Sequence, residues 1–327
     1  MKIVIPGGTG QVGTILARYF QTRGDEVVIL SRKKSAAFTP WRVVQWNGRT
    51  QGAWSKELDG CDVVINLTGR SVNCRYTKKN REEILQSRVM SIIAIEAAIS
   101  QAQIPPRIWL QAGTATIYAH RYNAPNDETT GLLGGNETDA PDTWKFSIDV
   151  ALAWEQAFND ADTPHTRKVL LRSAMTMSPD PGGVLDTLLG LVRLGLGGRE
   201  GNGKQYVSWI HYEDFICALV FLMEHDEISG AVNLASPHPL PNDEFMREMR
   251  TAAGVRVGLP ATEWMLEIGA IFLQTETELI LKSRRVIPGR LLDYGFQFRH
   301  PFWRDAIKNL LEDRGHHLRK ADVIAQS

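Results

Sequence analysis

The chain opens with Met1-Lys2-Ile3-Val4-Ile5-Pro6-Gly7-Gly8-Thr9-Gly10-Gln11-Val12-Gly13, an apolar run that enters a turn with four glycines. Residues 14–22 then carry apolar side chains at helical spacing, and residues 27–30 form a second apolar run after Gly24. This order predicts a strand, a glycine-rich turn, a helix and a second strand within about 30 residues. Such a βαβ unit is typical of a parallel sheet.

The same alternation of strand and helix continues to residue 172. The predicted strands are residues 62–67, 107–111 and 168–172, and the predicted helices are residues 79–102 and 146–159. Strands that are apolar along their whole length, with helices between them, are buried on both faces. The sequence therefore predicts an α/β fold with a doubly wound parallel sheet.

The glycine turn has the spacing Gly8-x-Gly10-x-x-Gly13 between a strand and a helix, the context that a dinucleotide-binding fingerprint requires. Glycines let the backbone approach a pyrophosphate, and the helix N-terminus supplies N–H groups with a partial positive charge. The alternative is a tight turn without a ligand. The residues predicted to bind the dinucleotide here are Gly7, Gly8, Thr9, Gly10, Gln11, Val12 and Gly13.

The end of the second strand indicates which dinucleotide binds. NAD-binding sites place Asp or Glu near this point to bind a ribose hydroxyl, whereas this chain has Ser31-Arg32-Lys33-Lys34. A guanidinium attracts a 2′-phosphate, and a carboxylate would repel it. The alternative is an ordinary basic loop. We predict NADP rather than NAD as the cofactor, bound by Ser31 and Arg32.

The composition changes after Pro179, where glycine, proline and long hydrophobic predicted helices (residues 185–196 and 264–281) dominate. This change indicates a second lobe. The expected divisions are a Rossmann-type NADP-binding domain at residues 1–178 with a returning segment near 205–236, a smaller, mainly helical lobe at 179–310, and a tail at 311–327. Two lobes create a cleft, where we expect a small-molecule substrate or ligand.

Composition excludes other classes of partner. The 327 residues have a formal net charge of zero, with 43% hydrophobic and 23% charged residues, so we expect neither nucleic acid nor a membrane as partner. Cys61, Cys74 and Cys217 lack the spacing of a zinc site or a disulfide framework, so no metal is expected. No apolar leader precedes the first strand, and we predict a cytoplasmic protein.

Three stretches resemble the extended short-chain dehydrogenase/reductases. The spacing Gly7-x-x-Gly10-x-x-Gly13 is similar to their glycine motif, and Asn66-Leu67-Thr68-Gly69 is similar to the turn after their fourth strand. Ala112-Gly113-Thr114-Ala115-Thr116-Ile117-Tyr118-Ala119 is similar to their Ser-Ser-Ser-Ala-Thr-Val-Tyr-Gly segment.

More narrowly, the chain resembles the bacterial epimerase family proteins, often labelled nucleoside-diphosphate-sugar epimerases, over residues 1–310. The motifs that carry this likeness are Ser87-Arg88, Trp154-Glu155, Leu194-Gly195-Leu196-Gly197-Gly198, Ser208-Trp209-Ile210-His211-x-x-Asp214, Arg285-Val286-Ile287-Pro288 and Gly295-Phe296-x-Phe298. Further cofactor contacts are expected at Leu67, Thr68, Gly69, Glu83, Arg88 and Thr176. The Arg88 guanidinium can bind phosphate, and Glu83 on the same predicted helix is expected to orient it.

The wider superfamily uses Asn, Ser/Thr, Tyr and Lys for catalysis, with Tyr and Lys four residues apart on one helix. In this chain the four positions fall on Arg88, Thr114, Phe146 and Val150, and no Tyr-x-x-x-Lys occurs. Phenylalanine cannot transfer a proton, so a reductase would need another acid. We predict Thr114 and Tyr118 as catalytic residues, with His120 and His211 as alternative acids; each of the three acids also has a purely structural interpretation.

Two functions are consistent with this pattern. The first is an NADP(H)-dependent oxidoreductase or epimerase of the short-chain dehydrogenase/reductase type that works without the Tyr-x-x-x-Lys pair. The second is a non-catalytic module that binds NADP(H) as a structural or sensing ligand. Thr114 and the two-lobe layout favour the first. The discriminating feature is whether the nicotinamide faces a titratable side chain or a filled apolar wall.

Overall fold

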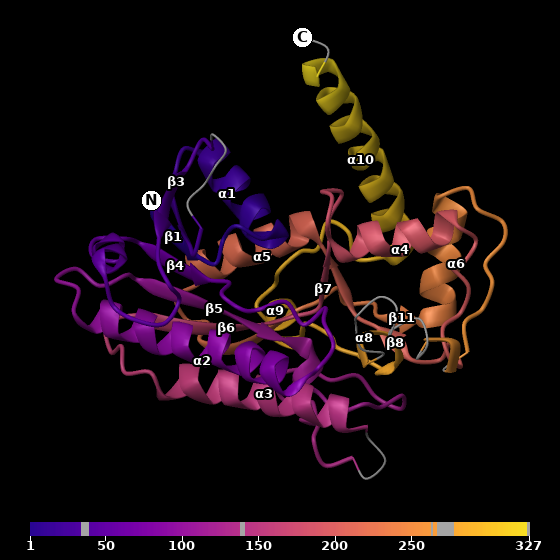
Figure 1. The fold of residues 1–327 in the computed structure, drawn as a ribbon, viewed down its shortest axis with the longest axis horizontal. Helices are drawn as coiled ribbons and strands as arrows, with labels where there is room; N and C mark the ends of the chain where they lie inside the picture. Colours follow the sequence, from indigo (N-terminus) through magenta and orange to yellow (C-terminus); the bar gives the residue numbers. More distant parts are fainter. Residues whose placement is uncertain (34–38, 138–140, 263, 267–277, 326–327) are drawn as a thin grey trace. The chain divides into compact units, whose positions relative to one another are not determined.

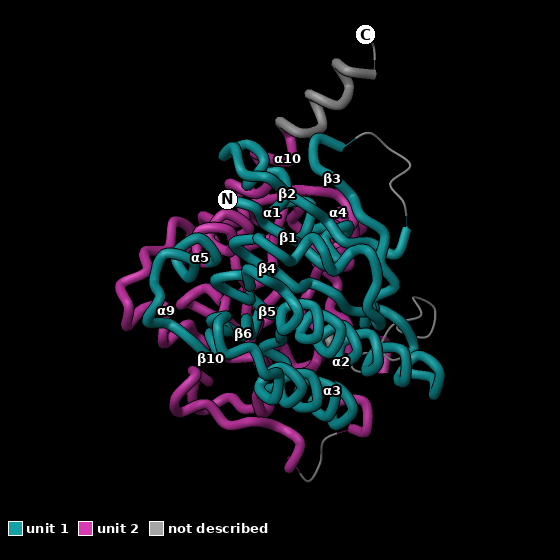
Figure 2. The backbone as a smooth tube through the Cα atoms, turned by 90° about the vertical axis from the view of Figure 1, so that its left-hand side faces the viewer, with its two compact units in different colours: residues 1–117, 145–173, 219–232 teal, residues 118–144, 174–218, 233–327 magenta. Residues whose placement is uncertain are grey.

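The computed structural model describes residues 1–33, 39–137, 141–262, 264–266 and 278–325. Figure 2 shows the chain in two compact units: unit 1 comprises residues 1–117, 145–173 and 219–232, and unit 2 comprises residues 118–144, 174–218 and 233–327. Lys34 and most of the helix predicted at residues 264–281 lie outside the described residues.

A seven-stranded sheet carries the glycine turn (Figure 1). Its strands are β1 (Lys2–Pro6), β2 (Glu26–Ser31), β3 (Arg42–Gln45), β4 (Val63–Asn66), β5 (Ile108–Thr114), β6 (Arg167–Ser173) and β10 (Gly230–Leu234). They follow the order β10-β6-β5-β4-β1-β2-β3, and the pairs from β3 to β6 are parallel. The direction of winding therefore reverses at β1, as in a doubly wound sheet. The predicted fold class is confirmed.

Helices alternate with these strands. They are α1 (Gln11–Arg23), α2 (Lys78–Ser100), α3 (Asp142–Asp160) and α5 (Tyr212–Glu224), with short 3-10 helices η1 (Ala53–Glu57) and η2 (Ala115–Ile117). Helices α2 and α3 lie side by side along one face of the sheet (Figures 1 and 2). Helix α1 begins directly after Gly10 and ends at Gly24, whose φ of 91° is a left-handed conformation that glycine adopts without strain.

Unit 2 consists mainly of helices with two small sheets. The helices are α4 (Val184–Arg193), α6 (Asn242–Ala252), α8 (Glu278–Leu281), α9 (Gly289–Asp293) and α10 (Trp303–Ala325); the sheets pair β7 (Met175–Met177) with β9 (Trp209–His211) and β8 (Tyr206–Val207) with β11 (Leu240–Pro241). Leu189, Phe245 and Ile307, from α4, α6 and α10, belong to its core. Among the helices that the structure describes, none is long and apolar enough to cross a membrane.

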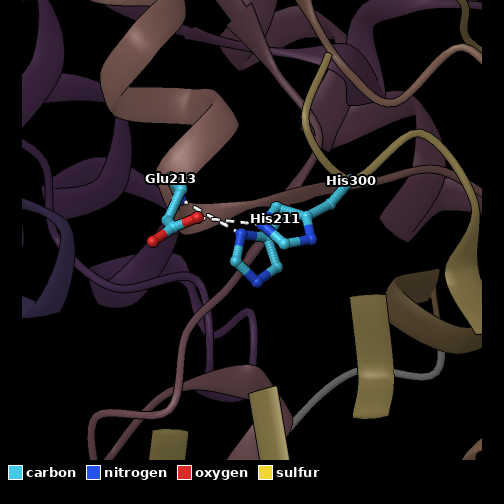
Figure 3. A group of neighbouring side chains, drawn as sticks. All are labelled: His211, Glu213 and His300. Carbon is cyan, nitrogen blue, oxygen red and sulfur yellow. Dashed lines mark hydrogen bonds and ion pairs between the residues drawn. The ribbon is translucent and has the colours of Figure 1, made fainter. Parts of the chain in front are cut away.

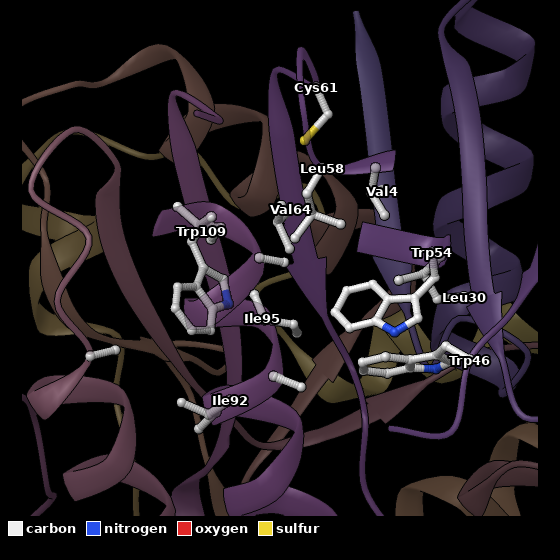
Figure 4. Packing of buried hydrophobic residues seen from close by; sticks show 14 of the residues in the cluster. Val4, Leu30, Trp46, Trp54, Leu58, Cys61, Val64, Ile92, Ile95 and Trp109 are labelled. Atoms are coloured by element: carbon white, nitrogen blue, oxygen red, sulfur yellow. The ribbon is translucent and has the colours of Figure 1, made fainter. Parts of the chain in front are cut away.

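A cluster of large apolar side chains in unit 1 joins strands of the sheet to helices α2 and α3 (Figure 4). Val4, Val64 and Trp109 contribute from neighbouring strands and Ile95 from α2. Trp109 also packs edge-on against Phe158 of α3, with 4.9 Å between the ring centroids. Because both helices share this core with the strands, the polar residues that α2 carries are held in fixed positions relative to the sheet.

Two isoleucines of α2 give a matched test of this core. Ile95 is fully buried, whereas Ile93 is 45% exposed. We expect Ile95→Ala to lower the free energy of unfolding by about 2–5 kcal/mol, because the variant loses buried methyl groups and leaves a cavity. Ile93→Ala should change it by about 0.5 kcal/mol or less. Equal losses for the two variants in urea-induced unfolding would contradict this packing.

Candidate cofactor-binding and active site

The glycine turn between β1 and α1 is held by close backbone contacts. A Cβ on Gly7, where φ is +74°, would lie 2.8 Å from the Cα of Thr68, and a Cβ on Gly13 would lie 2.4 Å from the backbone of Gly8. Neither position accepts a side chain without movement of the backbone. A Cβ on Gly10 would meet no atom within 4 Å. Gly10 therefore faces open space.

Helix α1 has an uncapped N-terminus at this turn. The N-cap residue Gly10 has no side chain to cap the helix, and no acidic residue lies in the first helical turn. Thr9 and Gly10 are exposed, and Gln11 and Val12 are half-buried. The positive end of the helix dipole thus lies beside an accessible glycine, an arrangement that fits a phosphate group.

Ser31 ends β2 as a buried residue, and Arg32 and Lys33 follow it on the surface. The Ser31 Oγ accepts a hydrogen bond from the backbone N of Lys33 at 3.3 Å, and the backbone O of Arg32 accepts one from Gln45 Nε2 at 3.3 Å. In the described part of the chain the Arg32 guanidinium forms no ion pair. An anion at the end of β2 can therefore bind it without displacing a carboxylate.

The turn after β4 is held by the buried amide of Asn66. Its Nδ2 donates to Gln111 Oε1 at 2.8 Å and to Ser91 Oγ at 3.3 Å, and its Oδ1 accepts from the backbone N of Thr68 at 3.0 Å. These bonds satisfy the buried amide on both sides. They also fix the predicted contact residues 67–69 beside the glycine turn.

Neither Ser91 nor Gln111 is predicted from the sequence, although a signal was present. Asn66 and Gln111 are polar residues in two strands that are otherwise apolar, and they are register partners between β4 and β5. A buried amide needs a hydrogen-bond partner. Two amides in successive buried strands therefore indicate a pair.

The guanidinium of Arg88 packs against the same turn. It donates to the backbone O of Arg70 at 3.1 Å and of Ile84 at 2.9 Å, and it lies 4.9 Å from the ring of Trp154. A Cβ on Gly69 would lie 3.3 Å from the Arg88 Cζ, so the glycine leaves room for the cation. Burial lowers the pKa of Arg88 to about 10, and the group stays charged at neutral pH.

Glu83 does not orient Arg88, and that prediction is wrong. The Glu83 carboxylate forms an ion pair with Arg70, whose backbone N donates to Ser87 Oγ at 2.9 Å. The physical reason is helical spacing. Side chains three or four residues apart share a face of a helix, whereas Glu83 and Arg88 are five apart and point in different directions.

Phe146 and Val150, at the positions of the superfamily's Tyr and Lys, lie in an apolar cluster with Tyr76 and Ile84. The Phe146 ring is edge-on to Tyr76, with 5.0 Å between the ring centroids, and the Arg81 guanidinium lies 4.6 Å from the Phe146 centroid. Both substituted positions are therefore packed. This geometry supports a filled wall rather than a reductase site that lacks one hydroxyl.

Thr114 is the last residue of β5 and Tyr118 lies four residues later, and the two differ in environment. Thr114 is half-buried, and its Oγ1 accepts from the backbone N of Thr116 at 3.2 Å. Tyr118 is 2% exposed, and its hydroxyl donates to Asn233 Oδ1 at 2.9 Å. The structural interpretation of Tyr118 is favoured, because its proton is already engaged. Its catalytic role stays a prediction.

His211 lies beside a second histidine in unit 2, with their rings tilted by 31° (Figure 3). Its ring centroid lies 3.7 Å from that of His300, and its Nδ1 accepts from the backbone N of Glu213 at 3.3 Å. The Glu213 carboxylate is 2.9 Å from His300 Nε2. Burial, and then the proximity of His300, lower the pKa of His211 to about 3. The imidazole is therefore neutral at neutral pH and cannot supply a proton as an imidazolium.

These three side chains bring possible metal-ligand atoms within 4.8 Å of one another. However, the Nδ1 of His211 already accepts a backbone N–H, and His300 Nε2 already contacts the Glu213 carboxylate. The cluster instead supports the loop at His300, whose backbone N donates to Asp214 Oδ2 at 2.9 Å.

The remaining predicted cofactor contact, Thr176, is half-buried in β7 of unit 2, opposite Ile210 of β9 in the sheet register.

The pattern of the NAD dependent epimerase/dehydratase family matches residues 3–235, and that of a domain of unknown function (DUF1731) matches residues 261–310. The first match covers more than half of the chain. The chain therefore belongs to the NAD dependent epimerase/dehydratase family, and the predicted resemblance is confirmed.

Individual relatives extend over almost the whole chain. Human epimerase family protein SDR39U1 is 29% identical over 316 residues, which are 95% of this chain and 100% of that protein. Epimerase family protein SERP0438 from Staphylococcus epidermidis is 28% identical over 313 residues, 95% of this chain and 99% of that protein.

Solved structures show the same fold. The crystal structure of human SDR39U1 (isoform2) with NADPH has a TM-score of 0.82 at 28% identity, covering 95% of this chain and 99% of that chain. UDP-N-acetylglucosamine 4-epimerase from Bacillus cereus has a TM-score of 0.70 at 16% identity, covering 95% of this chain and 98% of that chain. This second likeness concerns the fold alone.

The apolar cluster can be tested by restoring the superfamily's residues. Val150 is 6% exposed, so Phe146→Tyr combined with Val150→Lys places an unpaired ammonium in an apolar environment. We expect the free energy of unfolding in urea to fall by roughly 3 kcal/mol or more. Phe146→Tyr alone is the control and should cost about 1 kcal/mol or less, because this ring is half-buried. A double variant as stable as the parent would show that the wall is not closely packed.

Proposed function

We propose that this chain binds NADP(H) at the glycine turn and acts on a small-molecule substrate as an oxidoreductase or epimerase without the Tyr-x-x-x-Lys pair. The observation that carries the proposal is the open N-terminus of α1, where a Cβ on Gly10 would meet no protein atom. The relatives add support, because the family is named for NAD dependence and human SDR39U1 was crystallised with NADPH.

The residues at the end of β2 favour NADP(H) over NAD(H). Ser31, Arg32 and Lys33 stand where an NAD-binding site carries a carboxylate. A guanidinium forms charge-assisted hydrogen bonds with a phosphate, and Arg32 has no ion-pair partner in the described part of the chain. Selectivity would thus come from one exposed cation at the strand end.

When bound, NADPH supplies a hydride. The other tasks fall to this chain's own residues. The N–H groups at the start of α1 bind the pyrophosphate, and Arg32 binds the 2′-phosphate. Arg88 holds the turn at residues 67–69 through the carbonyl of Arg70. Thr114, at the carboxyl end of β5, donates a hydrogen bond to the substrate.

A non-catalytic NADP(H)-binding module is the second candidate. The packing of Phe146 and Val150 favours it, since neither of these two side chains can transfer a proton. The two functions differ in one measurement, the oxidation of NADPH in the presence of a panel of aldehydes and ketones. Turnover supports the enzyme, and tight NADPH binding without turnover supports the module.

The state of the cysteines indicates the kind of cellular compartment in which the protein functions. Cys61, Cys74 and Cys217 are all free thiols. Unpaired cysteines are typical of a reducing compartment, and we propose the cytoplasm.

Arg32→Ala tests the choice of cofactor. We expect the parent to bind NADPH more tightly than NADH in titration calorimetry, and Arg32→Ala to weaken NADPH binding by roughly 1.5–3 kcal/mol with little effect on NADH. Lys56→Ala, which removes another exposed cation of unit 1, is the control and should leave both affinities unchanged. Equal affinities of the parent for the two cofactors would overturn the NADP assignment.

Gly10→Val tests the phosphate site. The added side chain meets no protein atom within 4 Å at its Cβ, so the melting temperature without cofactor should stay within about 2 °C of the parent's. The side chain would occupy the space beside the N-terminus of α1, so stabilisation by NADPH should be lost. Gly190→Ala, also in open space, should keep it. A Gly10→Val variant that NADPH still stabilises would place the pyrophosphate elsewhere.

A further inference from the structure

Of the three candidate proton donors in unit 2, His120 is the least buried. The hydroxyl of Tyr118 is buried and engaged with Asn233, and His211 is fully buried. His120, by contrast, is half-buried, and no hydrogen bond is formed by its Nε2 among the described residues.

The tautomer of His120 is fixed by a backbone contact. Its Nδ1 lies 2.8 Å from the backbone N of Ser283, which can only donate. Nδ1 must therefore accept, and in the neutral ring the proton lies on Nε2. A second proton on Nδ1 would face the N–H of Ser283 and break this bond.

The charged neighbours of His120 also favour the neutral ring. Burial, Lys282 and Arg284 lower the pKa of His120, and Glu137 opposes them. Glu137 accepts from the backbone N of His120 at 3.1 Å and from that of Gly135 at 2.6 Å. Burial is the largest of these effects, and the net result is a lowered pKa of His120. His120 is therefore a neutral donor at neutral pH, not an imidazolium.

Packing holds the ring in one orientation. The His120 centroid lies 5.1 Å from that of Tyr122 and 4.9 Å from that of Trp144. Ser283 is itself fixed, because its Oγ donates to the backbone O of Arg121 at 3.0 Å and accepts from the backbone N of Tyr206 at 3.0 Å. A donor that is held before the ligand arrives binds with less loss of conformational entropy.

We propose that His120 is a substrate-binding residue whose Nε2–H donates a hydrogen bond to an acceptor oxygen, a carbonyl or a carboxylate, of a small-molecule ligand. The proposal rests on the proposed function for the nature of the substrate. Tyr122, which is 39% exposed beside the imidazole, offers apolar surface to the rest of the ligand. Such a donor stabilises negative charge on a carbonyl oxygen and keeps its own proton.

Nitrogen NMR of the protein with isotope-labelled histidine tests the donor before any ligand is added. We expect His120 to show an unprotonated Nδ1 and a protonated Nε2, and to titrate below the ordinary range of histidine. Protonation of Nδ1 at neutral pH, or a titration at or above the ordinary value, would overturn the proposal. This measurement uses the parent protein without NADPH, so it is independent of cofactor binding.

Ligand binding is then tested on the full chain with 4-nitrobenzaldehyde as the carbonyl probe and 4-nitrobenzoate as the carboxylate probe, with and without saturating NADPH. We expect one probe to shift the His120 Nε2 signal, which identifies the acceptor. His120→Phe should weaken binding of that probe about tenfold. The exposed His165 supplies the control, His165→Phe, which should bind like the parent.

Two outcomes of the probe titrations count against His120. One is that neither probe moves the Nε2 signal, and the other is that His120→Phe binds the active probe as tightly as the parent. Failure of NADPH to bind in calorimetry would instead count against the proposed function. The signal in the parent protein decides the question even where the His120→Phe variant does not fold.

Discussion

The contact between the backbones of Gly7 and Thr68 is the constraint on which the candidate site depends. It brings the turn after β1 against the turn after β4, two strands that pair in parallel. Both turns therefore lie at the carboxyl edge of the sheet, where the winding reverses and the edge is open to a ligand. A side chain at Gly7 would separate the turns. Gly10, three residues later, has no such internal role and faces open space.

Helix α2 couples this edge to the core. Ser87 and Ser91 bond to the turn after β4 or to the amide that supports it, and Arg88 packs on Gly69. Other side chains of the same helix, such as Ile95, are buried among the strands. The apolar packing therefore sets the position of the polar contacts. A change in the core that shifts α2 would also shift the turn at residues 67–69.

At Phe146, Val150 and Arg88 this chain differs from the superfamily's catalytic residues, and at each of these positions the residue present has its own partners. Phe146 and Val150 do not leave gaps, because Tyr76 and Ile84 pack against them. Arg88 likewise has its own partners in the carbonyls of Arg70 and Ile84. The apolar cluster of Tyr76, Ile84, Phe146 and Val150 is thus a packed part of unit 1. Neither the Phe146 nor the Val150 side chain has a hydrogen-bond donor for a substrate.

The sequence by itself determined the main alternation of strands and helices through residue 172, the glycine turn and the cationic end of β2, because these follow from periodicity and backbone rules that act within a few residues. Strand β3 was not among the predicted strands. The tertiary structure alone decided which side chains meet. The pairing of β4 with β5 brings Asn66 into hydrogen-bond contact with Gln111. Glu83 forms its ion pair with Arg70 rather than with Arg88, because of its direction on helix α2. The bond that fixes the His120 tautomer spans 163 residues. No local pattern encodes a contact between residues so far apart in the sequence.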